Sequence, residues 1–159
     1  MKANARGQTI TEFALLMPIM MVIFGAAVDF GLAFFVANVV QNAAREGARF
    51  AVTLPDLPQS DVAVTCPSGD SRICDVVGKK IPNISLFDGL TVTYQGPTDV
   101  PGDGTTQLMV NVTVSGVTYK YMFLPLVSAP LPLLGFSSFP TSVTISRSTT
   151  MRWESQIPL

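Results

Sequence analysis

Histidine is absent from this sequence of 159 residues. Its absence removes the commonest general base, the usual serine or cysteine catalytic triad and the commonest imidazole metal ligand. Charged residues are also scarce, at 13% of the chain, which is about half the usual share in a soluble domain. The composition therefore excludes most familiar hydrolase mechanisms and indicates that part of the chain contacts lipid.

The sequence also lacks an excess of charge of either sign. Ten Lys and Arg residues stand against eleven Asp and Glu residues, for a net charge of -1. A basic field that could hold a phosphate backbone is missing, so we expect no nucleic-acid partner. No constellation of Asp or Ser residues suggests an active site, and we expect no enzyme activity, no cofactor, no metal and no small-molecule substrate.

The apolar residues are concentrated near the N-terminus. From Phe13 to Phe35 the chain is apolar except for Asp29. A hydrocarbon core of roughly 30 Å needs about 20 such residues in a helix, so this segment is long enough to span a bilayer. Pro18 is expected to bend the helix or open one turn, since proline is tolerated in membrane helices. We predict one long helix over residues 8–51, with its transmembrane half at about 13–35.

Beyond Phe35 the helical pattern becomes amphipathic. One face carries Val36, Val39, Val40 and Ala43, and the other carries Asn38, Gln41, Asn42, Arg45, Glu46 and Arg49. Small residues recur at helical spacing, Ala33 with Ala37 and Ala43 with Gly47 and Ala51. Such spacing allows another helix to approach closely, although alanines are also simply good helix formers.

Two carboxylates flank or interrupt the apolar run. An ionised side chain at the middle of a membrane costs at least about 2.5–3.5 kcal/mol. Glu12 lies at the edge of the run, and Asp29 is interpreted as lying close to the outer interface. The two residues are roughly 25 Å apart along the helix, so they cannot share a proton or a metal ion.

Two readings of the N-terminus remain open from these residues. Lys2 and Arg6 precede the apolar run, as they would in a secretory signal, and Gly25 with Ala27 could mark a cleavage site that releases a chain starting at Val28. The protein would then be a Sec-secreted extracellular binding or adhesion domain. Against this, Glu12 directly precedes the apolar core, and the helical pattern continues through the supposed cleavage site. A membrane-anchored chain with a cytoplasmic N-terminus is the favoured reading.

Four motifs carry a resemblance to a known family. The segment Arg6-Gly7-Gln8-Thr9-Ile10-Thr11-Glu12-Phe13 resembles the class III signal peptide of type IV pilin-like proteins. Val28-Asp29-Phe30-Gly31 and Asn42-Ala43-Ala44-Arg45-Glu46-Gly47-Ala48-Arg49 are similar to the two helix motifs of the TadE-like family. Thr149-Thr150-Met151-Arg152-Trp153-Glu154 is similar to that family's closing strand. These bacterial proteins are minor pilin-like proteins, or pseudopilins, of tight-adherence (Flp) pilus assembly.

The resemblance implies a processing site and an assembly helix. A prepilin-type peptidase would cut after Gly7, leaving Gln8 as the mature N-terminus, with Glu12 fifth in the mature chain and Phe13 behind it. The new amine and Glu12 have opposite charges, so their pairing between neighbours would fix the stagger of adjacent helices. Further assembly residues would be Asp29, Gly31, Arg45, Glu46, Gly47 and Arg49. The implied partners are the membrane, the peptidase, other pilin-like subunits and the pilus assembly platform.

The composition changes after Ala51, where a head domain is expected. Pro55 and Pro58 mark a linker over residues 52–61, and residues 62–159 follow as an extracytoplasmic head. Alternating patterns predict strands at 90–94, 108–114 and 143–145, with a long hairpin loop over 96–106 and a short helix over 75–80. The predicted fold class is α+β, a long N-terminal helix packed against a small antiparallel sheet, as in type IV pilins. Residues 1–7 would be the leader peptide.

Cys66 and Cys74 are the only cysteines. Two thiols without histidine cannot form a structural zinc site, and their spacing is not that of a redox motif. We expect a disulfide, which would place the head in an oxidising compartment outside the cytoplasm. Two reduced, half-buried thiols are the alternative.

A second apolar stretch spans residues 121–136 and contains Pro125, Pro130 and Pro132. Three prolines forbid a continuous membrane helix. The stretch is predicted to be a loop or crossover that buries side chains against the sheet, namely Phe123, Leu124, Leu126 and Leu134. A contact surface for a partner subunit or for the outer membrane leaflet is the alternative.

Overall fold

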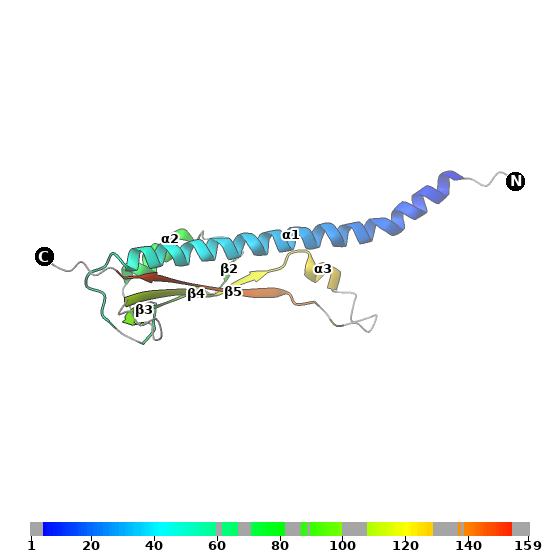
Figure 1. Ribbon diagram of the computed structural model, residues 1–159. Coiled ribbons are helices and arrows are strands. Elements are labelled where there is room, and N and C mark those ends of the chain that lie inside the picture. The colour runs from blue at the N-terminus through cyan, green and yellow to red at the C-terminus, as the bar shows by residue number, and fades with distance from the viewer. Residues whose placement is uncertain are drawn as a thin grey trace. The chain divides into compact units, whose positions relative to one another are not determined.

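The computed structural model describes residues 5–59, 62–66, 71–81, 87–88, 90–99, 108–128, 137 and 139–153. The chain divides into two compact units. The first comprises Met1–Phe34 with Lys120–Val143, and the second comprises Phe35–Tyr119 with Thr144–Leu159. Helix α1 (Ala5–Ala51) contributes to both units (Figure 1).

Helix α1 confirms the predicted long N-terminal helix and begins a few residues earlier than expected. It continues through Pro18, and its blue N-terminal part is bent in Figure 1. By length and composition the helix is apolar enough to cross a membrane. In the first unit it lies beside the short helix α3 (Leu124–Ser128). Shortly before α3 in the chain, Tyr121 N donates a backbone hydrogen bond of 3.0 Å to Thr141 O.

The second unit contains an antiparallel sheet. Its strands are β1 (Val64–Thr65), β2 (Phe87–Asp88), β3 (Thr91–Asp99), β4 (Leu108–Lys120) and β5 (Ser142–Arg152). The order is β1-β3-β4-β2, and β5 also pairs with β4. Side-chain hydrogen bonds from Asn111 to Thr150 and between Thr118 and Thr144 show that β4 and β5 run in opposite directions. The predicted α+β fold class is therefore confirmed.

Strand β4 buries alternate side chains, and its alternation shifts by one residue at Gly116. Val110, Val112 and Val114 are buried, and the buried positions then become Val117 and Tyr119. Gly116 has a φ of 76°, in the left-handed region that favours glycine. One extra residue at this point returns Val117 and Tyr119 to the buried face, as in a β-bulge.

Strand β3 is longer than the sequence predicts. The hairpin loop was predicted over 96–106, and this start is too early, because Thr98 and Asp99 still pair with Met109 and Leu108. The register shifts between Gln95 and Thr98, so the strand tolerates Pro97 at a bulge, where a missing N–H is accommodated. Residues 100–107 lie outside the described part of the chain. Helix α2 (Ser71–Lys80) also begins earlier than the predicted helix over 75–80.

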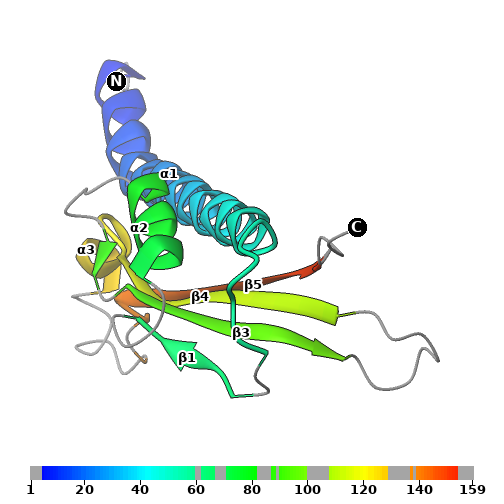
Figure 2. The same ribbon diagram turned by 90° about the vertical axis from the view of Figure 1, so that its left-hand side faces the viewer.

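The C-terminal part of α1 and helix α2 lie on the same face of the sheet (Figure 2). The predicted stripe of α1 faces inward, with Val36, Val40 and Ala43 fully buried and Val39 partly buried. Burying a valine side chain stabilises the fold by about 1.5–3 kcal/mol. The two predicted faces of this half of α1 are thus correct.

The segment after α1 packs against the second unit. Leu54 and Leu57 are buried, and Trp153 Nε1 donates a hydrogen bond of 3.3 Å to the Leu54 carbonyl. Trp153 N also donates to Leu108 O at 2.7 Å, which extends the end of β5 along β4. At these positions the segment predicted as a linker is anchored to the unit, because its leucines form part of the core.

Candidate membrane and assembly site

The first part of α1 presents large apolar side chains to its surroundings. The exposed ones between residues 10 and 24 are Ile10, Phe13, Leu15, Leu16, Met17, Ile19, Met20, Met21, Val22, Ile23 and Phe24. Transfer of such surface out of water is favourable at roughly 25 cal/mol per Å². A helix with this surface is stable in lipid or against other apolar helices.

The predicted processing residues all lie in the first turns of α1. Gly7 and Gln8 are helical, Glu12 is exposed, and Phe13 is exposed as well. Glu12 is separated from Gln8 by about 6 Å along the helix axis, at 1.5 Å per residue. This spacing permits the charge pairing that the resemblance implies.

Asp29 has a different environment. Its side chain is fully buried, and its carboxylate accepts three backbone hydrogen bonds. Met122 N donates to Oδ1 at 2.9 Å, Phe123 N to Oδ2 at 2.9 Å, and Leu124 N to Oδ2 at 2.7 Å. These amides lie at the start of α3, where helical N–H groups lack partners within the helix. Asp29 therefore caps α3 from a distant part of the sequence.

A capping carboxylate satisfies donors that would otherwise be left unpaired. Hydrogen bonds to a charged group contribute about 1.5–3 kcal/mol, and a buried donor without a partner is costly. The carboxylate is in turn surrounded by donors, which compensates for its removal from solvent. Sequence reasoning missed this role, because the partners are backbone amides 93 to 95 residues away and carry no side-chain signal.

The segment that contains α3 corrects the prediction made for residues 121–136. Phe123 is 38% exposed and Leu126 is 73% exposed, so neither is buried against the sheet. Leu124 is partly buried, and Leu134 lies outside the described residues. Phe123 instead lies over Gly25 of α1, where an added Cβ would be 2.8 Å from Phe123 Cβ. Pro125 is accommodated in the first turn of α3, where proline is tolerated.

The remaining assembly-helix residues fall into two groups. Gly31, Arg45 and Arg49 are exposed, and a Cβ added at Gly31 would contact no atom within 4 Å. Glu46 is partly buried, and its Oε1 lies 3.8 Å from Lys80 Nζ of α2. The exposed group remains available for contacts with another subunit.

Gly47 is buried beneath α2 and the sheet. A Cβ added there would lie 2.5 Å from Val77 Cγ2 and 3.3 Å from Val112 Cγ1. Its neighbours Ala43, Ala44, Ala48 and Ala51 are fully buried too. The small residues in this part of α1 thus allow α2 of the same chain to approach closely, in the way expected of small residues at helix interfaces.

Cys66 and Cys74 form a disulfide with a Cα–Cα distance of 6.1 Å, as expected. The bridge joins the end of β1 to α2, and Cys66 N donates a hydrogen bond of 2.8 Å to Val92 O in β3. It therefore ties α2 to the edge of the sheet. Among the residues that the structure describes, no group of three or more His, Cys, Asp or Glu side chains could hold a metal ion.

Comparison with known families finds a match to the N-terminal helix. Residues 7–49 match a family model, TadE, described as TadE-like protein. The N-terminal helix is therefore similar to the TadE-like family. The matched range spans Gly7 to Arg49 and so includes all the residues predicted for the processing site and for the assembly helix. It lies entirely within α1, so the TadE-like resemblance is confirmed for this helix. The comparisons with curated proteins and with solved structures found no match.

Proposed function

We propose that this chain is a membrane-anchored, pilin-like subunit for the assembly of a tight-adherence (Flp) pilus or a related secretion system. The observation that carries the proposal is the TadE match over residues 7–49, which coincides with a helix apolar enough to cross a membrane. The role is structural rather than catalytic. The subunit acts through helix–helix and head–head contacts with other pilin-like subunits and with the assembly platform.

In this proposal the N-terminus is cytoplasmic and the head, residues 62–159, is extracytoplasmic. Residues 1–7 are a leader, residues 8–51 the helix, and residues 52–61 the connection to the head. The Cys66–Cys74 disulfide supports an oxidising compartment for the head. A prepilin-type peptidase removes the leader by cutting after Gly7, where the absence of a side chain lets the backbone lie close to a protease.

The alternative, a secreted domain cleaved near Ala27, is less compatible with the packing of the first unit. Cleavage there would remove Gly25, over which Phe123 lies. It would also leave Asp29 in the second position of the new chain, where helices fray. Helix α1 continues through Ala27 without a break.

The mature N-terminus tests the proposal. The full chain is expressed in a host that has a prepilin-type peptidase, extracted from the membrane fraction and analysed by intact mass and N-terminal sequencing. We expect Gln8 to be the first residue, and Met1 to be retained when the peptidase is inactivated. A start at Val28 in soluble protein would support the secreted domain instead.

Gly7→Val provides a matched variant. It keeps the length and charge of the leader but adds a β-branched side chain at the cut site, so it should remain uncleaved and still membrane-bound. Gly31→Val is the control, since an added Cβ at Gly31 meets no neighbouring atom, and it should be cleaved normally. Normal cleavage of Gly7→Val would contradict the assigned site.

A further inference from the structure

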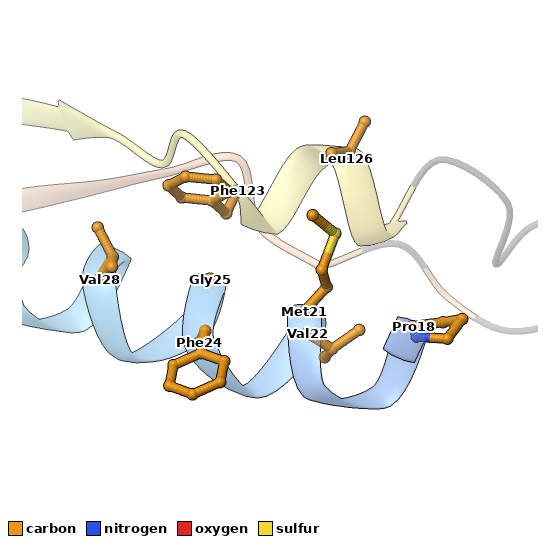
Figure 3. A pocket seen from close by; sticks show the side chains of 8 residues that line it. All are labelled: Pro18, Met21, Val22, Phe24, Gly25, Val28, Phe123 and Leu126. Carbon is orange, nitrogen blue, oxygen red and sulfur yellow. The ribbon is translucent and has the colours of Figure 1, made fainter. Parts of the chain in front are cut away.

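An apolar groove lies between α1 and α3 in the first unit. Its volume is about 460 Å³, within the range of about 300–1,000 Å³ that is usual for small-molecule sites. No lining residue is charged or carries a polar side chain. The lining residues are Pro18, Met21, Val22, Phe24, Gly25, Val28, Phe123 and Leu126. Figure 3 shows Met21 of α1 and Phe123 on either side of the space between the two segments.

The side chains around the groove are large, apolar and exposed. Met21 is 67% exposed and Met122 is 62% exposed, in addition to Leu126 and Phe123. An exposed apolar surface of this kind marks a site that lipid or another apolar surface covers. The groove therefore belongs to a surface that is unsuited to water.

The position of the groove along α1 indicates whether lipid or another apolar surface covers it. Pro18 and Val28 lie about 8 Å and 23 Å along the helix axis from Phe13, at 1.5 Å per residue. If the membrane span starts at Phe13, both residues lie within the hydrocarbon core of roughly 30 Å. Phe123 lies over Gly25 and Leu126 lines the same groove, so both share this depth with α1.

A chain segment that enters the hydrocarbon must have its backbone polar groups paired. The start of α3 would fail this condition, because the first N–H groups of a helix have no acceptor within it. Asp29 supplies acceptors for the N–H groups of Met122, Phe123 and Leu124, and it is itself fully buried. The carboxylate thus satisfies the N–H groups at the start of this turn, as placement in lipid requires.

We propose that residues 121–128 are embedded in the outer part of the bilayer and that the groove between α3 and α1 holds an acyl chain of a phospholipid. The inference rests on the membrane anchoring in the proposed function and adds a lipid contact made by a segment outside the transmembrane helix. A hydrocarbon chain fits the groove because its lining offers no polar group that would orient a polar ligand. Close approach of a second helix at Gly25 is disfavoured, because Phe123 already occupies that position.

Nitroxide labels on single introduced cysteines test the depth of the segment. The full chain, with its native disulfide oxidised, is reconstituted into phosphatidylcholine–phosphatidylglycerol nanodiscs. Labels are placed in turn by Leu126→Cys in α3, Ile23→Cys in α1 and Thr91→Cys in β3, all of which are exposed. The accessibility of each label to oxygen, which concentrates in lipid, is compared with its accessibility to a water-soluble nickel chelate.

We expect the labels at Leu126 and Ile23 to favour oxygen severalfold relative to the label at Thr91. A water-exposed label at Leu126 with a lipid-exposed label at Ile23 would overturn this inference and leave the membrane anchor intact. Water exposure of both labels would overturn the anchor as well. A Leu126 label shielded from both reagents, with spin–spin broadening that disappears on dilution with unlabelled chain, would show that a second copy covers the surface instead.

A phosphatidylcholine with a photoreactive group on its acyl chain tests the occupant. After illumination in nanodiscs, we expect lipid adducts on the peptides that contain residues 18–28 and 121–128. Gly25→Leu, which places a side chain toward the groove, should lower the adducts on residues 121–128 severalfold, whereas Gly31→Leu should not. Adducts spread evenly along α1, with none on residues 121–128, would overturn the assignment of the groove even if the Gly25→Leu chain does not fold.

Discussion

Asp29 and Phe123 are joined by a hydrogen bond of 2.9 Å from the Phe123 amide to Asp29 Oδ2, across 94 residues of sequence. Together with the neighbouring amides of Met122 and Leu124, this bond fastens α3 to α1. The Asp29 side chain thus anchors α3 to α1 by accepting hydrogen bonds from backbone amides at the start of α3. A carboxylate is costly in an apolar helix, but the Asp29 carboxylate attaches a second segment, α3, to α1.

Replacement of Asp29 should release this segment. Asp29→Ala leaves three backbone N–H groups without their acceptor, and each charge-assisted bond contributes about 1.5–3 kcal/mol. Amide hydrogen exchange at residues 122–124, measured by mass spectrometry in nanodiscs, should become at least about tenfold faster, since about 1.4 kcal/mol corresponds to a factor of ten. Asp29→Asn keeps one acceptor oxygen and should give an intermediate rate.

Asp75 offers a control for the loss of a carboxylate. It is exposed on α2, and Asp75→Ala should leave exchange at residues 122–124 unchanged. Equal exchange in the Asp29→Ala and unsubstituted proteins would mean that α3 is held by its apolar contacts alone.

The extent to which the sequence predicts the fold follows from the range of the interactions. Helix α1 and the buried faces of its C-terminal half were predictable, because hydrophobic periodicity is a local signal. The shift of alternation at Gly116 was not, because a single glycine in a strand does not reveal whether it adopts a positive φ. The cap at Asp29 was not predictable either, because its partners are backbone amides, which every residue except proline carries, so that no residue type marks them. The exposure of Phe123 and Leu126 was mispredicted, since an apolar run indicates burial in protein and in lipid equally well.

The contact between Gly47 and Val77 predicts a strong effect of a small substitution. Gly47→Ala would place its Cβ 2.5 Å from Val77 Cγ2 and should destabilise the second unit by about 1–3 kcal/mol, as overpacking does. Trp153, the only tryptophan, is bonded to this unit, so its fluorescence during chemical denaturation in detergent reports the loss.

Gly78 in α2 is the matched control. An added Cβ there meets no atom within 4 Å, so Gly78→Ala should raise stability by up to about 1 kcal/mol through helix propensity. Val77→Ala combined with Gly47→Ala should recover part of the lost stability. A Gly47→Ala protein as stable as the Gly78→Ala protein would show that α2 does not pack closely on α1 in solution.

Removal of the disulfide should loosen the attachment of α2 to the sheet. Cys66 and Cys74 are separated by eight positions, and closing so short a loop stabilises the fold by about 2–3 kcal/mol in the chain-entropy description. The double variant Cys66→Ser, Cys74→Ser should therefore unfold at a lower denaturant concentration, followed by Trp153 fluorescence. Free-thiol counting on denatured protein from the membrane fraction should find none in the unsubstituted chain, and two thiols per chain would contradict the bridge.

Glu12 is predicted to pair with the N-terminal amine of a neighbouring subunit. The two groups of one processed chain lie about 6 Å apart along the helix axis, and opposite charges attract each other more strongly in a low-dielectric setting than in water. A zero-length carbodiimide cross-linker applied to membranes should therefore join the amine of Gln8 to the Glu12 carboxylate. Mixing isotopically labelled and unlabelled chains distinguishes bonds between chains from bonds within one chain.

Glu12→Ala should abolish the cross-link while leaving Gln8 as the first residue, and Glu12→Asp should retain part of it. Cross-links confined to single chains would show that Glu12 neutralises its own N-terminus and does not set the stagger between subunits.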